Sequence, residues 1–483
     1  MTTEQAAIDS VPKDLFIGGR WVTAASSMPV VDPSTAQTLC EVADASPDEA
    51  MRALDAAAEA QPSWARTSPR ERSEILSRAY QLMIDETERL ALVMTLEMGK
   101  PLAESRGEVA YAAEFLRWFA EEAVRIDGGY MTAPNGGSRF LVSKEPVGVS
   151  LLITPWNFPL AMGTRKIGPA IAAGCTSVIK PAGLTPLCTL AFADILTRAG
   201  LPDGVVNVVL TSHSNDTMSP MIADPRSRKL SFTGSTGVGR KLLEQCSQTI
   251  MRTSMELGGN APFLVFDDAD LDAAVEGAMA AKMRNIGQAC TAANRILVQR
   301  GVAEEFASKL TARMQQAPMG RGTEDGVVVG PLINSGAVEK VDSLVQDATG
   351  RGATVRLGGS PQEGPGYFYP ATVLTGVPAE AEMGSTEIFG PVAALTEFDS
   401  EEEGIRLAND TPYGLVSFAY TQDFARGIRV SEALEAGMVG LNKGVVSNPA
   451  APFGGIKESG LGREGGFVGI DEFLETKYVG FDV

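Results

Sequence analysis

The sequence predicts an α/β protein with two doubly wound domains, and two observations lead to this prediction. Short apolar runs alternate with helical stretches from about residue 147 onward, which is typical of parallel sheets covered by helices. The alternation starts anew near Ala261, so we expect a boundary at Gly258-Gly259. The length of 483 residues allows two or three domains, at about 150 residues each.

The N-terminal part is predicted to start with strands and to continue with helices. Residues 15–45 have the pattern of short strands and turns. A Ser-Pro-x-Glu capping pattern begins at Ser46 and again at Ser68, and each should start a helix. We expect the second helix to run to about Met98 and a third to cover Leu102–Arg125.

The two alternating series supply the expected strands and helices of the two sheets. The first series has expected strands at Val149–Ile153, Thr176–Ile179, Val205–Val209 and Lys229–Phe232, and expected helices at Met162–Ala173, Pro186–Arg198, Ser214–Ala223 and Gly237–Cys246. The second series comprises Phe263–Phe266, Leu271–Arg284, Arg295–Val298, Ala303–Met314, Gly390–Phe398, Glu401–Asn409 and Val416–Tyr420.

Composition narrows the class of protein. A net charge of −19 argues against nucleic acid or an anionic membrane as partner, although a local basic pocket can still bind an anion. No apolar run approaches the length of a membrane span, and Met1–Asp14 lacks the apolar core of a signal peptide. The five cysteines form no CxxC pair, which disfavours a disulfide framework and a zinc site. We therefore expect a cytoplasmic protein without a bound metal.

The most informative pair of residues is Cys290 and Glu256. Cys290 ends Gly-Gln-Ala-Cys, and Glu256 begins Glu-Leu-Gly-Gly-Asn, so each lies beside glycines in a turn. The chain has one histidine, His213, so a Cys–His nucleophile pair would depend on that residue alone. If Cys290 performs covalent chemistry, a carboxylate or water is the expected proton partner.

Three further motifs have both a functional and a structural interpretation. The turn Gly-Ser-Thr-Gly-Val-Gly at 234–239 follows a predicted strand and can cradle a phosphate, or it can be an ordinary strand–helix turn. Asn157 can hold a developing oxyanion, or it can serve only in a turn between prolines. Lys180 ends a predicted parallel strand, where such sheets bind ligands, but a solvated surface lysine has the same signature.

The order of all the motifs is more specific than any one of them. The ordered set is Pro-Trp-Asn-Phe-Pro at 155–159, Lys-Pro-Ala at 180–182, Phe-Thr-Gly-Ser at 232–235, Glu-Leu-Gly-Gly-Asn-Ala-Pro at 256–262, Gly-Gln-x-Cys at 287–290, Glu-Ile-Phe-Gly-Pro at 387–391 and Pro-Phe-Gly-Gly-x-Lys-x-Ser-Gly at 452–460. This set resembles the aldehyde dehydrogenase superfamily over nearly the whole chain.

The resemblance implies a role for each matching residue. Cys290 would be the nucleophile, Glu256 the general base, and Asn157 an oxyanion donor together with the backbone N–H of Cys290. Lys180 would bind the adenosine ribose region, and Glu387 the nicotinamide ribose. The full cofactor-binding set would be Thr154, Pro155, Trp156, Lys180, Pro181, Ala182, Gly183, Phe232, Gly234, Ser235, Val238, Leu257, Glu387 and Phe389.

The resemblance also implies a domain plan. Residues 1–126 and 147–258 would form a dinucleotide-binding domain, and 259–465 a catalytic domain. Residues 127–146 and 466–483 would form a small β hairpin segment that supports a homodimer or homotetramer. The C-terminal strand, at about residues 475–479, would pair with that hairpin or with a neighbouring subunit.

Within the superfamily, the chain looks most like the succinate-semialdehyde dehydrogenases. In that subfamily the arginines matching Arg165 and Arg284 grip the distal carboxylate of the substrate, helped by a serine matching Ser447. A planar guanidinium suits a carboxylate. Structural ion pairs are the alternative role for the two arginines. Glutarate semialdehyde and short sulfonated or phosphonated aldehydes remain alternative substrates.

Three positions depart from the pattern of the relatives. Met283 stands where phenylalanine is common, and Ala292 replaces a second cysteine that some relatives use in a redox switch. Gly183 stands where NAD-preferring relatives often carry the glutamate that binds the ribose 2′-hydroxyl. We therefore expect NADP to be preferred, with NAD also usable.

Two other classes of function compete with a hydrolytic dehydrogenase. A non-catalytic relative that keeps only the fold is disfavoured by the intact Cys290, Glu256 and Asn157. A CoA-acylating enzyme is disfavoured because such enzymes usually lack a glutamate at the position of Glu256.

Overall fold

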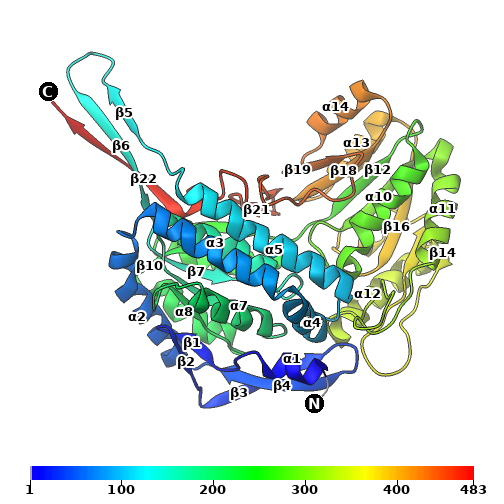
Figure 1. Cartoon of the computed structure of the whole chain (residues 1–483). Helices are drawn as coiled ribbons and strands as arrows, with labels where there is room; N and C mark the ends of the chain where they lie inside the picture. Colours follow the sequence, from blue (N-terminus) through cyan, green and yellow to red (C-terminus); the bar gives the residue numbers. More distant parts are fainter. Residues whose placement is uncertain (1–2, 483) are drawn as a thin grey trace.

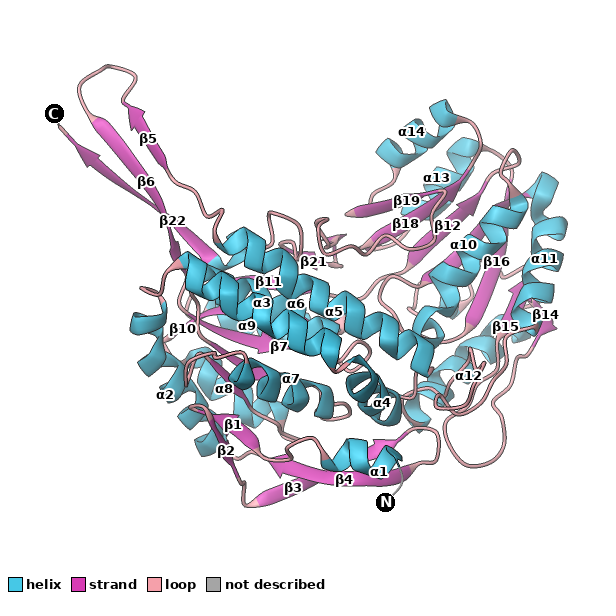
Figure 2. Cartoon of the chain, viewed as in Figure 1, coloured by secondary structure: helices cyan, strands magenta, loops and turns pink. Residues whose placement is uncertain are grey.

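The computed structural model describes residues 3–482, which form two α/β units and a projecting β arm (Figures 1 and 2). The predicted domain that starts at residue 1 and the predicted segment that ends at residue 483 therefore lie partly outside the described residues. The sheets confirm the predicted fold class of two doubly wound α/β units with a small hairpin.

The first unit is organised around an eight-stranded sheet whose five central strands are parallel. From edge to edge its strands are β2 (Arg20–Val22), β1 (Leu15–Ile17), β9 (Val206–Val208), β8 (Ser177–Lys180), β7 (Val149–Ile153), β10 (Ser227–Thr233), β11 (Arg252–Glu256) and β21 (Gly460–Leu461). The chain leaves β7 in one direction for β8 and β9 and returns on its other side with β10. This reversal between β7 and β10 is the place where open α/β sheets bind ligands.

Helices cover both faces of this sheet. On one face α6 (Ala161–Ala173) and α7 (Leu187–Arg198) pack on the strands, with α3 (Pro69–Asp85), α4 (Thr87–Met98) and α5 (Leu102–Ala123) outside them. The other face packs against α2 (Pro47–Trp64), α8 (Ser214–Ala223) and α9 (Thr236–Ser247). A short helix α1 (Thr3–Asp9) and the ribbon β3 (Ser26–Asp32) and β4 (Gln37–Asp44) complete the unit.

The predicted helix starts are confirmed, but one predicted helix is divided. Ser46 and Glu49 form the reciprocal capping box, and Ser68 accepts a hydrogen bond from the backbone N–H of Glu71. The prediction of a single helix that reaches Met98 is wrong. The backbone is not helical at Glu86, where φ is −103° and ψ is 17°, so α3 ends and α4 begins there. No glycine or proline marks this break in the sequence.

The second unit contains a seven-stranded sheet with an apolar core on each face. Its strands, in order, are β14 (Thr354–Leu357), β15 (Thr372–Thr375), β16 (Val392–Phe398), β13 (Ala293–Gln299), β12 (Ala261–Val265), β18 (Val416–Tyr420) and β19 (Met438–Leu441). Its helices are α10 (Leu271–Met283), α11 (Ala303–Gln315), α12 (Ser335–Gly350), α13 (Glu401–Asn409) and α14 (Phe424–Ala433). Phe263 and Val265 enter one apolar core, whereas Leu264 and Phe266 enter the core on the opposite face.

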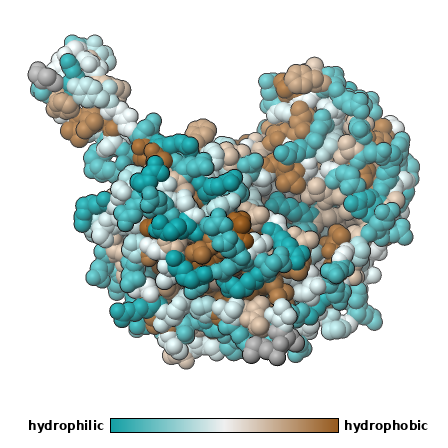
Figure 3. Space-filling view, viewed as in Figure 1, coloured by the Kyte–Doolittle hydropathy of each residue, from teal (hydrophilic) through white to brown (hydrophobic). Residues whose placement is uncertain are grey.

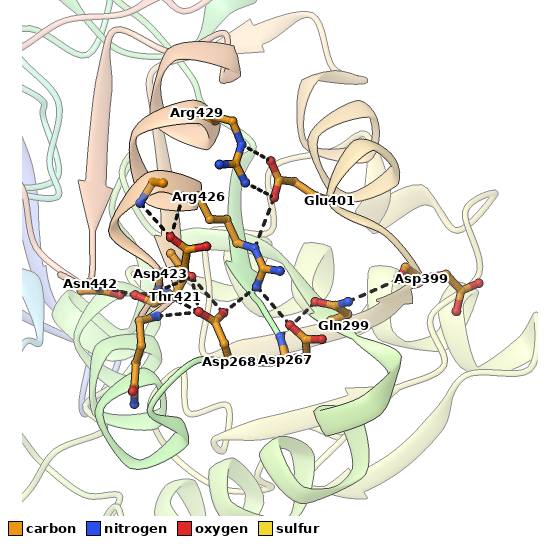
Figure 4. A network of polar contacts seen from close by, with 12 residues as sticks. Asp267, Asp268, Gln299, Asp399, Glu401, Thr421, Asp423, Arg426, Arg429 and Asn442 are labelled. Atoms are coloured by element: carbon orange, nitrogen blue, oxygen red, sulfur yellow. Dashed lines mark hydrogen bonds and ion pairs between the residues drawn. The ribbon is translucent and has the colours of Figure 1, made fainter.

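A polar network fixes α13 and α14 to the ends of β12 and β18 (Figure 4). Arg426 pairs with Asp267, Asp268 and Glu401, and Asp268 also accepts a hydrogen bond from Thr421 Oγ1. None of these residues lines the main cavity of the described chain. The network is therefore a structural clamp on one side of the second unit.

The arm is a three-stranded antiparallel sheet that leaves the main body (Figure 1). It consists of β5 (Gly129–Thr132), β6 (Arg139–Pro146) and the C-terminal strand β22 (Leu474–Phe481), with β6 in the centre. The C-terminal strand thus pairs with the hairpin of its own chain. No helix described in residues 3–482 has the length and apolar character needed to cross a membrane.

Candidate active site

The predicted motifs meet along one edge of the first sheet. The parallel register pairs Ile153 with both Lys180 and Phe232, and it pairs Thr233 with Glu256. The strands β8, β7, β10 and β11 therefore end in one row, although their residues lie far apart in the sequence. The glycine turn at 234–235 continues from this row into the N-terminus of α9.

The row borders a cavity of about 360 Å³ between the two units. The predicted site residues that line it are Pro155, Trp156, Asn157, Arg165, Gly234, Ser235, Leu257, Arg284, Cys290, Glu387, Phe389 and Ser447. The predicted residues outside its wall are Thr154, Lys180, Pro181, Ala182, Gly183, Phe232, Val238 and Glu256. Most of this second group lies farther along the sheet edge and the start of α9, where the adenosine half of a dinucleotide would extend.

Cys290 stands on a loop with an unusual backbone. Asn285, Ile286 and Gly287 all have positive φ, at 55°, 60° and 73°. A β-branched residue such as Ile286 rarely adopts this conformation, so the loop stores local strain. Only glycine fits at 287, because a Cβ there would lie 2.1 Å from the Gly390 carbonyl oxygen.

The Cys290 thiol is half-buried in the cavity wall. Burial raises its pKa to about 12, and the carboxylates of Glu387 and Glu256 also raise it, whereas Arg165 and Arg284 lower it. Gly259 permits the close approach of the segment before β12 to the Cys290 loop, since a Cβ there would lie 2.5 Å from the Cys290 carbonyl oxygen.

Asn157 lies beside this loop, as its predicted role requires. Its Nδ2 donates a hydrogen bond to the Gln288 carbonyl at 3.0 Å. An amide nitrogen carries two hydrogens, so the second remains available for an oxyanion in the cavity. Asn157 and Cys290 therefore line the same space, as an oxyanion donor and a nucleophile would have to.

Glu256 is fully buried behind the cavity, and neither of its carboxylate oxygens has a hydrogen-bond partner within the described chain. Burial raises its pKa well above the ordinary value, and repulsion from Glu464 adds to this, while Arg165 and Lys166 oppose it. An unpaired buried carboxyl with a raised pKa has the properties of a general base.

The two arginines predicted to grip a substrate have different surroundings. Arg165 is fully buried, and its Nε lies 2.6 Å from Glu464 Oε2 as an ion pair, outside hydrogen-bond geometry. Arg284 forms no ion pair or hydrogen bond within residues 3–482; its guanidinium lies over the ring of Phe158 at 5.0 Å. The Arg284 guanidinium is therefore a cation of the cavity wall without a partner among the described residues, whereas Arg165 is shared with an internal acid.

Glu387 and Phe389 form the opposite side of the cavity. Glu387 Oε1 accepts a hydrogen bond from the Gly259 N–H at 3.2 Å, and burial raises its pKa to about 7. The rings of Phe389 and Trp156 meet edge to face at 5.4 Å. Lys340 also lines this side, and its charge lowers the Glu387 pKa.

Lys180 is a buried cation without an anion. Among residues 3–482 its Nζ has neither an ion pair nor a hydrogen bond, and burial lowers its pKa to about 8. The neighbouring Gly183 has room for a side chain, because a Cβ there would be 3.6 Å from Met28 Sδ. These two positions fit the phosphate-bearing end of a dinucleotide, and Glu387 with the turn at 234–235 fits the rest.

Four charged residues behind the site were missed by reasoning from the sequence. Lys166 and Arg165 both pair with Glu464, and Lys100 pairs with Glu108. All four of Lys100, Glu108, Lys166 and Glu464 are buried. In the sequence, Lys166 directly follows the predicted substrate residue Arg165, and Glu464 comes shortly after the motif at 452–460. This proximity was the only signal that could have pointed to them.

The chain is similar to known proteins over almost its whole length. The model of the family described as "Aldehyde dehydrogenase family" matches residues 21–479. A succinate-semialdehyde dehydrogenase of Paenarthrobacter nicotinovorans is 58% identical over 442 residues, which are 92% of this chain and 98% of the relative. A glutarate-semialdehyde dehydrogenase of Pseudomonas aeruginosa is 49% identical and covers 96% of both chains. A solved structure described as an Escherichia coli NADP-dependent enzyme has a TM-score of 0.97 at 49% identity, covering 98% of both chains.

Proposed function

Since the chain belongs to the aldehyde dehydrogenase family, we propose that it oxidises a short anionic aldehyde, with succinate semialdehyde as the first candidate. The observation that carries this proposal is the unpaired Arg284 guanidinium in the wall of the cavity that also contains Cys290. A distal carboxylate would give this cation the bidentate partner that residues 3–482 do not supply. Ser447 lines the same cavity and would add a hydroxyl donor.

The residues support a covalent mechanism. Cys290 loses its thiol proton to a carboxylate or water as its sulfur adds to the aldehyde carbon, and the free Asn157 amide N–H donates a hydrogen bond to the resulting oxyanion. A nicotinamide dinucleotide, held by Lys180, the turn at 234–235 and Glu387, would supply the oxidising power by accepting a hydride. The product on Cys290 is then a thioester. Glu256 removes a proton from the water that attacks it, which releases a carboxylate and restores the thiol.

The test is a panel of aldehydes that differ only in the distal group, which is carboxylate, sulfonate, phosphonate or methyl. We expect the anionic aldehydes to have the higher kcat/KM, by about 30-fold or more if about 2 kcal/mol of charged hydrogen bonding is gained. A methyl-ended aldehyde of equal kcat/KM would contradict the proposed role of Arg284. Comparing the carboxylates by chain length distinguishes succinate from glutarate semialdehyde.

For the cofactor, we propose NADP in preference to NAD. Lys180 offers an unmatched buried cation, and Gly183 offers no carboxylate that would repel a 2′-phosphate. A solved relative described as NADP dependent, 49% identical to this chain, supports the proposal. A kcat/KM for NAD more than about tenfold above that for NADP, or 1.4 kcal/mol, would contradict it.

Gly183→Glu is expected to shift the preference toward NAD. The new carboxylate would accept a hydrogen bond from the ribose 2′-hydroxyl and repel a 2′-phosphate beside Lys180. We expect the ratio of kcat/KM for NADP over NAD to fall by about tenfold or more. Gly183→Gln is the matched control, since it has the same size without the charge and should change the ratio much less. Equal changes in both variants would indicate a steric effect.

We further propose that the first unit binds the dinucleotide, the second carries the nucleophile, and the arm joins subunits of a homo-oligomer. The arm exposes apolar side chains that a partner subunit would cover (Figure 3), among them Tyr130, Met131, Leu141, Tyr478 and Val479. Sedimentation of the full chain tests this part, because a monomer at micromolar concentration would contradict it.

A further inference from the structure

The orientation of the Asn157 amide depends on groups that do not themselves line the cavity. Two buried donors converge on the main-chain carbonyl of Asn157. Lys100 Nζ donates to it at 2.8 Å, and Asn285 Nδ2 donates to it at 2.9 Å. Lys100 and Asn285 are 1% and 0% exposed, so water does not compete for either bond.

Asn285 closes a ring of hydrogen bonds between Asn157 and the Cys290 loop. Its Nδ2 also donates to the Gln288 carbonyl at 2.9 Å, and the same carbonyl accepts the hydrogen bond from Asn157 Nδ2 at 3.0 Å. The Asn285 amide thus donates both to the main-chain carbonyl of Asn157 and to the Gln288 carbonyl that accepts from the Asn157 side chain. Gln288 is two residues before Cys290, so the ring ties the oxyanion donor to the nucleophile loop.

The backbone at Asn285 is held in a conformation that the ring requires. Asparagine tolerates the left-handed region better than other non-glycine residues, and Asn285 has φ 55° and ψ 35°. The Asn285 N–H donates to the carboxylate of Glu104, on α5 of the first unit. On the same helix, Glu108 accepts from the N–H groups of Leu160 and Ala161 and pairs with Lys100. One helix therefore anchors both sides of the ring.

We propose that Asn285 is a positioning residue, which orients the Asn157 amide relative to the Cys290 loop for the oxyanion. The proposal rests on the proposed function, in which Asn157 stabilises the oxyanion formed by Cys290. Asn285 is placed to act through Asn157, because the two amides share the Gln288 carbonyl. It does not line the cavity, so it would act without touching the substrate.

The test is a double-mutant cycle on the hydride-transfer step, with Asn285→Gly and Asn157→Ala. Glycine keeps the left-handed backbone at 285 and removes the amide. We expect Asn285→Gly to slow the single-turnover formation of reduced dinucleotide by about 10- to 100-fold. In the Asn157→Ala background the same change should slow it by no more than about twofold. The KM for the dinucleotide should stay within about twofold in both backgrounds.

A matched control is Asn207→Gly. Asn207 is equally buried, and its Nδ2 also donates to two main-chain carbonyls, those of Ser177 and Gly204, away from the cavity. This variant should lower the thermal midpoint but leave the hydride step within about twofold of the unmodified chain. Asn285→Asp, which tolerates the same backbone and lacks the amide donor, replaces Asn285→Gly if that variant does not fold.

The outcomes separate this proposal from the proposed function. If Asn157→Ala alone leaves the hydride step unchanged, the oxyanion assignment fails, and the role of Asn285 fails with it. If Asn157→Ala slows the step but Asn285→Gly slows it equally in both backgrounds, only the positioning role of Asn285 is overturned. A loss confined to the background with Asn157 intact supports the proposal.

Discussion

Glu256→Gln is expected to keep the first burst of reduced dinucleotide and to lower steady-state turnover by about 10²- to 10⁴-fold. Hydride transfer needs Cys290 and the oxyanion donor, whereas hydrolysis of the thioester needs a base for the attacking water. Glu256 is buried and unpaired within the described chain, so it suits that base. Stopped-flow measurement of the burst, followed by the steady state, separates the two steps.

The pH dependence gives a second readout of the same variant. Glu256 acts as a base only when deprotonated, and burial and Glu464 raise its pKa above the ordinary value. Turnover limited by hydrolysis should therefore rise with pH through that raised pKa and lose this limb in Glu256→Gln. Glu97→Gln is a control, because Glu97 is an equally buried carboxyl that accepts from the N–H groups of Leu187 and Cys188, outside the cavity. Loss of the burst itself in Glu256→Gln would show that the assignment is wrong.

Arg284→Met is expected to remove the preference for an anionic aldehyde. The guanidinium has no ion-pair partner in the described chain, so its removal breaks no salt bridge, and Lys100 remains beside Glu104, whose pKa both cations lower. We expect kcat/KM for succinate semialdehyde to fall by about 30-fold or more, from a loss of about 2–5 kcal/mol at a buried charged contact. The value for a methyl-ended aldehyde of equal length should stay within about threefold.

Arg284→Lys is the informative companion to this variant. It keeps the charge but loses the planar fork, so an intermediate kcat/KM for the anionic aldehyde is expected. If both variants impair the anionic and the methyl-ended substrates equally, Arg284 stabilises the loop before Cys290 and does not bind the anion. Arg165→Met is a poorer probe, because it would leave the buried Glu464 without one of its two cationic partners.

Much of the fold was predictable because it follows from local patterns. The strand Val149–Ile153, the helix Ser214–Ala223 and the strand Val416–Tyr420 have the bounds that their apolar runs predicted. The capping box at Ser46 fixed a helix start from four residues of sequence. The break at Glu86 was not predictable, because it contains no glycine or proline and depends on how α3 and α4 pack.

The sequence by itself determined the chemical groups of this protein: a cysteine, a glutamate and an asparagine in glycine- and proline-rich turns at the ends of predicted strands. Chain order and residue type carry that information because each motif is local. Only the tertiary structure decided which charged and polar groups are paired with one another and which are left without a partner. It paired Arg165 with Glu464, left Arg284 unpaired, and placed Asn285 between Asn157 and Gln288. These are contacts between distant segments, and their charges interact strongly only because folding removes them from water.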